Sequence, residues 1–157
     1  MGTDSEHRAV IVGGGFGGLA CARALAGGPV QVVLVDRRDY HLFTPLLYQV
    51  ATALLTAVDI CCPLRSVFRG ARNVALVHDA VTGIDLERSL VLTGAGEQIP
   101  YDSLVLAAGG VDDHFGNAAL ARHTLSLKTL AGAQRLRNHV LACIEHADRE
   151  SDEQARR

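Results

Sequence analysis

The sequence predicts an α/β fold in which a parallel sheet packs with helices and is joined by a small antiparallel β-meander. Three observations indicate this: short apolar runs rich in β-branched residues, a glycine-rich turn directly after the first run, and apolar residues at helical spacing after that turn. Short, continuously apolar strands are typical of parallel sheets that are covered on both faces. Residues 8–37 are therefore predicted to form one strand–helix–strand unit.

The elements of this unit follow from the local sequence. The first strand is AVIV at 9–12, and the helix is FGGLACARALA at 16–26, with apolar residues at helical spacing. Gly27-Gly28-Pro29 ends this helix, because glycine adopts the left-handed conformation at a helix end and proline cannot continue the helix. The second strand is VQVVLV at 30–35, directly before Asp36.

Later in the chain the pattern changes to short strands and one long helix. Residues 40–58 contain no Asp, Glu, Lys or Arg, but their His, Pro and Gln would be costly in lipid, so we expect a loop and a helix buried in protein. A short helix is predicted to begin near Pro63. The remaining predicted elements are strands at 74–78, 80–85, 89–93 and 98–101, a hairpin turn at 94–97, a buried strand at 104–108 and an amphipathic helix at about 129–150.

Composition limits the possible partners. The 157-residue chain has a formal net charge of −2, which gives no reason to expect nucleic acid or an anionic membrane as a partner. Its four cysteines lack the spacing of a zinc site, and no metal is expected. The polar amino terminus is unlike a signal peptide and no transmembrane segment is expected, so the predicted location is cytoplasmic.

The glycine-rich turn contains the pattern G-x-G-x-x-G at Gly13, Gly15 and Gly18. It follows a predicted strand and opens a predicted helix, which is the context that a dinucleotide-binding fingerprint requires. Gly13 would allow the tight turn, Gly15 the approach of a pyrophosphate, and Gly18 the close packing of helix on strand. The helix amino terminus, which includes Phe16 and Gly17, would present its amides to the phosphates. The alternative is a glycine turn that binds nothing.

An acidic residue at the end of the second strand supports nucleotide binding. Asp36 can accept hydrogen bonds from both ribose hydroxyls of an adenosine, and it would repel a 2′-phosphate. NADP is therefore disfavoured, although Arg37 and Arg38 keep it open. The sequence thus predicts a Rossmann-like FAD/NAD(P)-binding domain, and the fingerprint alone leaves both FAD and NAD possible.

Six segments of the chain resemble the amino-terminal part of type II NADH dehydrogenases. These are single-subunit NADH:quinone oxidoreductases with FAD, in the pyridine nucleotide-disulfide oxidoreductase superfamily. DRRDYHLFTPLLYQVA is the most specific stretch. The segments are VIVGGGFGGLACARAL (10–25), VDRRDYHLFTPLLYQVATALL (35–55), DICCPLRSVFR (59–69), NVALVHDAVTGIDL (73–86), IPYDSLVLAAGG (99–110) and LSLKTLAGAQRLRNHVL (125–141).

The resemblance implies FAD as the cofactor and a role for each matching position. The glycine turn would face the pyrophosphate, and the aspartate with the arginine after it would hold the adenosine ribose. Of the later residues, two would lie near the flavin, one would face the adenine, and two would line the path of FAD. The cofactor-binding residues, in that order, are Gly13, Gly15, Phe16, Gly17 and Gly18; Asp36 and Arg37; Thr44 and Pro45; Val81; and Ala107 and Gly109. No residue is predicted as a catalytic acid or base.

The chain departs from the family pattern in two ways. Ala108 replaces the usual threonine of the second glycine turn, and Gly110 stands where alanine is common. Family members also continue into a second glycine-rich unit that binds NADH and into helices that attach them to membranes. The expected layout is a disordered tail at 1–7, a partial and, relative to the family, incomplete FAD-binding domain at 8–127, an amphipathic helix at 128–150 leading to a missing NADH domain, and a polar tail at 151–157.

Two functions from different classes follow. The first is the FAD-binding portion of an NADH dehydrogenase-like flavoprotein, which transfers a hydride from NADH to FAD and electrons on to a quinone. It would act with a partner chain or a missing carboxy-terminal half and be inactive as an isolated chain. The alternative is a truncated, non-catalytic dinucleotide-binding module. A third possibility, an NAD-binding dehydrogenase domain of another family, is disfavoured by the flanking matches.

Overall fold

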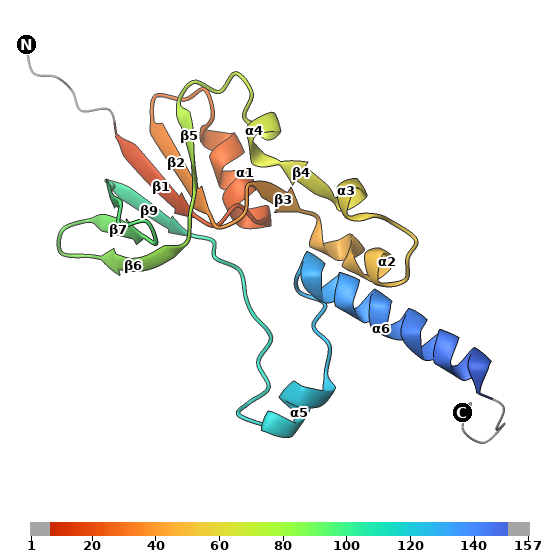
Figure 1. Cartoon of the computed structure of the whole chain (residues 1–157). Coiled ribbons are helices and arrows are strands. Elements are labelled where there is room, and N and C mark those ends of the chain that lie inside the picture. The colour runs from red at the N-terminus through yellow and green to blue at the C-terminus, as the bar shows by residue number, and fades with distance from the viewer. Residues whose placement is uncertain (1–6, 151–157) are drawn as a thin grey trace, which may run out of the picture. The chain divides into compact units, whose positions relative to one another are not determined.

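The computed structural model describes residues 7–150 and divides the chain into two compact units. The first unit comprises the chain up to His41 together with Cys62–Gly110. The second comprises Leu42–Cys61 together with the chain from Val111 onward. Figure 1 labels the elements of both units.

The two predicted tails fall largely beyond this description. Residues 1–6 and the predicted polar tail at 151–157 lie outside the described residues. His7, the last residue of the predicted amino-terminal tail, is described. Its imidazole lies 2.9 Å from the hydroxyl of Ser103, so His7 contacts the first unit directly.

The first unit is built on a four-stranded parallel sheet with the strand order β5-β2-β1-β9. In its register Val10 pairs with Val33 of one neighbouring strand and with Leu104 of the other. The sequence predicted all four strands, and their parallel pairing confirms the predicted fold class. The strands are β1 (Arg8–Val12), β2 (Gln31–Asp36), β5 (Val74–His78) and β9 (Ser103–Leu106).

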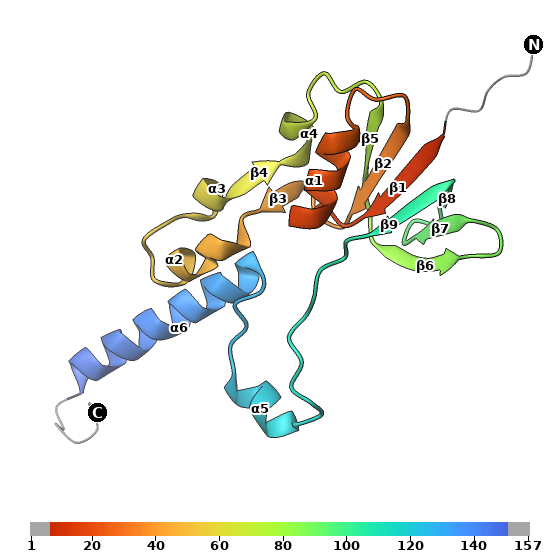
Figure 2. The same cartoon turned by 180° about the vertical axis from the view of Figure 1, so that it is seen from behind.

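Helices cover one face of this sheet. Successive side chains of a strand point to opposite faces, and Ile11 and Leu34 point to the helical one. They form a buried cluster with Ala22 of α1 (Phe16–Leu25) and with Leu64, the first residue of α4 (Leu64–Val67). Figures 1 and 2 show α1 and α4 on this side of the sheet. The small side chain of Ala22 lets α1 lie close to the strands.

The predicted antiparallel meander covers the other face. Its strands are β6 (Val81–Asp85), β7 (Leu90–Thr93) and β8 (Gln98–Pro100), paired in that order, and the predicted hairpin turn at 94–97 joins the last two. Val91 and Ile99, which pair with each other, are buried against Val10, Val12 and Val35 of the sheet. Along β1 and β2, the side chains that the meander buries therefore alternate with the side chains that face the helices.

Asp79 connects the end of β5 to the meander. Its carboxylate accepts hydrogen bonds from the backbone amides of Ala80 (2.7 Å) and Ala95 (2.8 Å). The Ala95 amide is the main cause of a pKa lower than usual for this carboxyl, and the Thr93 hydroxyl and the Ala80 amide add to the effect. These bonds hold the β7–β8 turn next to the start of β6.

The lowered pKa predicts that Asp79 makes stability depend on pH. A group with a depressed folded-state pKa contributes stability above its unfolded-state pKa of about 3.9, and this contribution is lost as the pH falls through the folded-state value. We therefore expect the urea concentration at the unfolding midpoint to decrease when the pH is lowered below about 4. In Asp79→Asn this decrease should be smaller. The exposed Glu87→Gln is the control. An equally steep fall in Asp79→Asn would contradict the role of Asp79.

The second unit is helical. Its elements are η1 (Thr44–Leu46), α2 (Leu47–Ala51), α3 (Ala57–Ile60), α5 (Ala118–His123) and α6 (Leu130–Arg149). α2 packs against α6, the predicted amphipathic helix, which begins where the Thr129 hydroxyl accepts the amide hydrogen of Gly132 (3.0 Å). No helix among residues 7–150 is both long and apolar enough to cross a membrane.

The chain passes between the units at β3 (Tyr40–Leu42) and β4 (Cys61–Pro63), which form a two-stranded sheet. The sequence predicted neither strand. The uncharged stretch at 40–58 was predicted as a loop and one helix, but the structure breaks it into three short helices. Ala53 adopts a left-handed φ of 61° after α2, and Thr56 caps α3 in a capping box with Asp59.

Candidate functional site

Most of the predicted cofactor residues lie at the carboxyl ends of the parallel strands. Ligands bind at this edge in open α/β sheets, because the turns that follow the strands form a crevice there. The glycine turn follows β1, Asp36 ends β2, and Ala107 directly follows β9. The turns after two neighbouring strands, β1 and β9, therefore meet at one place in the first unit.

Gly13 makes the tight turn that the sequence predicted. Its φ is +105°, a conformation that other residues rarely adopt, and its amide donates a hydrogen bond to the Val35 carbonyl (2.8 Å). A Cβ at this position would lie 2.3 Å from the carbonyl oxygen of Ala107. The Ala107 amide in turn donates to the Val12 carbonyl (2.8 Å). The two glycine-containing turns thus pack backbone to backbone.

Gly18 has the packing role that the fingerprint assigns to it. An added Cβ would lie 1.8 Å from the carbonyl oxygen of Gly13 and 3.2 Å from a side-chain carbon of Ile11. No side chain fits between α1 and β1 at this point. Gly13 and Gly18 are therefore required by the fold itself, with or without a ligand.

Gly15 is different, because nothing in the protein requires a glycine there. Its φ of −71° is open to any residue, and an added Cβ would meet no atom within 4 Å. Gly15 is also the N-cap of α1, a ten-residue helix with no acidic residue in its first turn. Open space in front of an uncapped helix amino terminus is the arrangement that a pyrophosphate needs, so these residues fit the predicted cofactor.

Asp36 is buried, with 9% of its surface exposed, and both of its carboxylate oxygens bind backbone amides. Oδ2 accepts from Gly14 (2.5 Å) and Oδ1 from Arg38 (2.7 Å). The Asp36 carboxylate therefore ties the end of β2 to the glycine turn, a contact that sequence reasoning missed. Each carboxylate oxygen has more than one acceptor position, so hydrogen bonds from a ribose remain compatible with this geometry.

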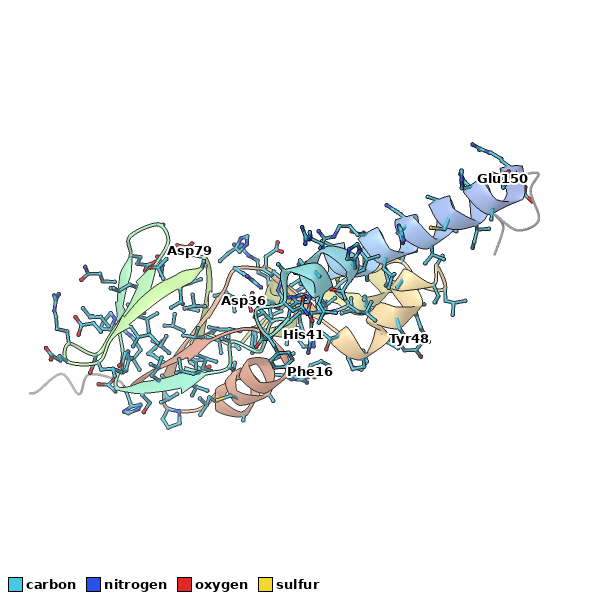
Figure 3. The ribbon with its side chains drawn as sticks, turned by 90° about the horizontal axis from the view of Figure 1, so that it is seen from below. Phe16, Asp36, His41, Tyr48, Asp79 and Glu150 are labelled. Carbon is cyan, nitrogen blue, oxygen red and sulfur yellow. The ribbon has the colours of Figure 1, made fainter. Side chains whose placement is uncertain are left out.

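His41 is a second residue that sequence reasoning missed. It is buried with 8% exposure, and its Nδ1 lies 3.1 Å from the Gly14 carbonyl oxygen. The Phe16 ring packs edge-on against it, with centroids 4.9 Å apart at 82°. Figure 3 labels Phe16, Asp36 and His41, which lie close together beside the glycine turn. No spacing rule in the sequence identifies this contact.

The other predicted residues lie in different surroundings. Val81 begins β6 and packs against the Val10 cluster. Arg37 is exposed, and its carbonyl oxygen lies 3.1 Å from the imidazole Nε2 of His78. Gly109 is exposed with a φ of +74°. Thr44 and Pro45 are exposed residues of η1, in the second unit.

Comparison with known proteins identifies related chains. The sequence model of the pyridine nucleotide-disulphide oxidoreductase family matches residues 7–147. The type II NADH:quinone oxidoreductase Ndh of Mycobacterium tuberculosis is 43% identical over 154 residues, which is 96% of this chain and 33% of that protein. NdhA of the same organism is 39% identical over 150 residues, 94% of this chain and 32% of that protein. The chain thus spans about a third of the length of these curated relatives.

A solved structure shares the fold. The sulfide:quinone oxidoreductase of Aquifex aeolicus aligns with a TM-score of 0.80 and 27% identity, over 88% of this chain and 32% of that chain. The predicted Rossmann-like fold and the resemblance to type II NADH dehydrogenases are both confirmed. Proteins of this kind are FAD-binding flavoproteins that use NADH. The chain belongs to the pyridine nucleotide-disulphide oxidoreductase family.

Proposed function

We propose that the first unit binds the ADP half of FAD, as part of an NADH dehydrogenase-like flavoprotein. The observation that carries this proposal is the contrast within the glycine turn. Gly13 and Gly18 are glycines because the protein packs against them, whereas Gly15 faces open space at the start of α1. A glycine that the fold does not need, at an uncapped helix amino terminus, is explained by a pyrophosphate that approaches the backbone there.

The chain's own residues bind and orient the cofactor. The turn from Gly13 to Gly18 holds the pyrophosphate, and Asp36 with Arg37 holds the adenosine ribose. By the resemblance, Val81 would offer its backbone to the adenine, Ala107 and Gly109 would line the path of the cofactor, and Thr44 and Pro45 are assigned to the flavin. The chemistry that bound FAD would supply is hydride transfer from NADH and electron transfer to a quinone.

The activity of the whole flavoprotein needs more than these residues. In this proposal residues 8–127 form the FAD-binding domain, and the helix at 128–150 leads toward an NADH-binding domain of the kind found in longer family members. That domain would come from further sequence or from a partner chain. The flavoprotein would be cytoplasmic and act beside the membrane that holds its quinone.

The direct test is a titration of the purified chain with FAD, followed by flavin absorbance and fluorescence. We expect binding by the wild-type chain. A colourless protein that binds NADH and not FAD would contradict the proposal. Adding NADH and a quinone to the loaded chain then separates the two functions: bleaching and turnover indicate an enzyme, and binding without reduction indicates a module.

Gly15→Ala tests the site itself. The added methyl group has room in the protein, so we expect at most a small fall in melting temperature, from the weaker N-cap preference of alanine. It occupies the space in front of the helix, however, so FAD binding should weaken about tenfold, which corresponds to about 1.4 kcal/mol. Gly110→Ala is the matched control, because its Cβ also meets nothing within 4 Å and Gly110 is not a proposed contact. Equal FAD affinity of the two variants would place the pyrophosphate elsewhere.

A further inference from the structure

We propose that His41 is a positioning residue for the dinucleotide. Together with Asp36 it clamps the peptide groups of Gly14 and so fixes the turn that presents the amino terminus of α1. The inference rests on the proposed function, since the turn matters as a cofactor site. It assigns His41 a role that the fingerprint does not contain.

The clamp consists of two side chains on one residue. The Gly14 amide donates to Asp36 Oδ2 (2.5 Å), and the Gly14 carbonyl oxygen lies 3.1 Å from His41 Nδ1. The backbone amide and the backbone carbonyl of Gly14 are thus both hydrogen-bonded to side chains, one from the end of β2 and one from β3. Both side chains are buried, so water competes little for either bond.

The geometry also decides the protonation of the imidazole. A carbonyl oxygen only accepts hydrogen bonds, so Nδ1 of His41 must carry the hydrogen. In the neutral ring Nε2 then has the lone pair. The ring orientation is fixed further by the edge-on contact with Phe16, the first residue of α1 (4.9 Å between centroids). His41 therefore contacts the turn at Gly14 and the helix at its first residue.

The turn needs such anchors because it contains three consecutive glycines, at 13, 14 and 15. Glycine loses more conformational entropy on ordering than any other residue, so an unanchored run would be mobile before a ligand binds. A site that is already ordered avoids this cost on binding. Gly13 is held by packing and by its bond to Val35, and Gly15 must stay open for the ligand. The Asp36 and His41 bonds at Gly14 therefore supply order without filling the site.

An isosteric pair of variants tests the clamp. The side-chain amide of His41→Asn can place a donor at the position of Nδ1, whereas His41→Leu has the same shape without a donor. We expect His41→Asn to bind FAD within about twofold of wild type, and His41→Leu to bind about three- to tenfold more weakly, as for loss of one hydrogen bond. His41→Leu leaves the buried Gly14 carbonyl oxygen without its donor, so its melting temperature should fall together with its affinity, and His41→Asn should restore most of both losses.

A second measurement is independent of FAD. Long-range proton–nitrogen NMR correlation should show a hydrogen on Nδ1 of His41. Hydrogen exchange at the Gly14 amide should be faster in His41→Leu than in His41→Asn.

The outcomes separate the clamp from the proposed function. Wild-type affinity in His41→Leu, or an Nδ1 without a hydrogen, would overturn the clamp. Equal losses of affinity and of melting temperature in His41→Asn and His41→Leu would also overturn it. A wild-type chain that binds no FAD would refute the proposed function alone, and the tautomer and the Gly14 exchange rates would then decide on the clamp.

Discussion

Gly18→Ala is expected to lower the free energy of unfolding by about 3 kcal/mol, although alanine is the better helix former. The added Cβ would lie 1.8 Å from the Gly13 carbonyl oxygen, so α1 must move away from β1 or the turn must open. Both atoms at the clash belong to rigid elements, and no side-chain rotation relieves it. Moving α1 also loosens the buried cluster around Ala22.

Urea unfolding followed by circular dichroism measures this effect. Gly17→Ala is a matched control in the same helical turn, because its Cβ would meet only the Ala107 methyl group at 3.9 Å. Higher helix propensity should leave this control unchanged or stabilise it by up to about 1 kcal/mol. Equal midpoints for the two variants would mean that α1 does not pack on β1 as described.

Asn73→Leu is expected to destabilise the first unit by about 2–4 kcal/mol, the largest effect predicted for a polar side chain. The Asn73 side chain accepts a hydrogen bond from the Gly27 amide (2.8 Å) and donates hydrogen bonds to the carbonyl oxygens of Leu25 (2.9 Å) and Val30 (2.8 Å). These groups lie in the turn between α1 and β2. Leucine keeps the volume and removes all three of these bonds, although the Leu25 carbonyl oxygen keeps its bond from the Gly28 amide (3.1 Å).

The comparison that isolates this effect is Asn138→Leu. Asn138 lies on the exposed face of α6, so the same substitution there should change stability by less than about 0.5 kcal/mol. Asn73→Asp adds a second readout. It retains an acceptor for Gly27 but turns a carboxylate oxygen toward the carbonyl oxygens, so it should be least stable above about pH 5, where the carboxyl is charged. If Asn73→Leu unfolds at the wild-type midpoint, the turn does not depend on Asn73.

Local sequence was enough for the features that depend on neighbours in the chain. The short apolar runs predicted the positions of these four strands within one or two residues, and the fingerprint predicted why Gly13 and Gly18 must be glycines. The turn at 94–97 followed from its own composition. In each of these places the residue type reflects the local conformation, so the pattern alone carries the information.

Contacts between distant segments were not predictable in this way. The Asn73 side chain caps a turn 43 to 48 residues earlier in the chain, and His41 reaches Gly14 across 27 residues. Neither has a spacing that marks it, because strand pairing and packing bring the partners together. The short strands β3 and β4 were missed for a different reason: three residues carry too little periodicity to stand out.

In the proposed function the first unit recognises the ADP half of FAD rather than its flavin. Competition measures this directly: the chain is loaded with FAD, either ADP or FMN is added, free ligands are removed by gel filtration, and the FAD that stays bound is released and measured by chromatography. We expect ADP to displace FAD, because it occupies the glycine turn and the Asp36 position, and we expect FMN to leave FAD bound. Displacement by FMN but not by ADP would show that the glycine turn does not bind the ADP half.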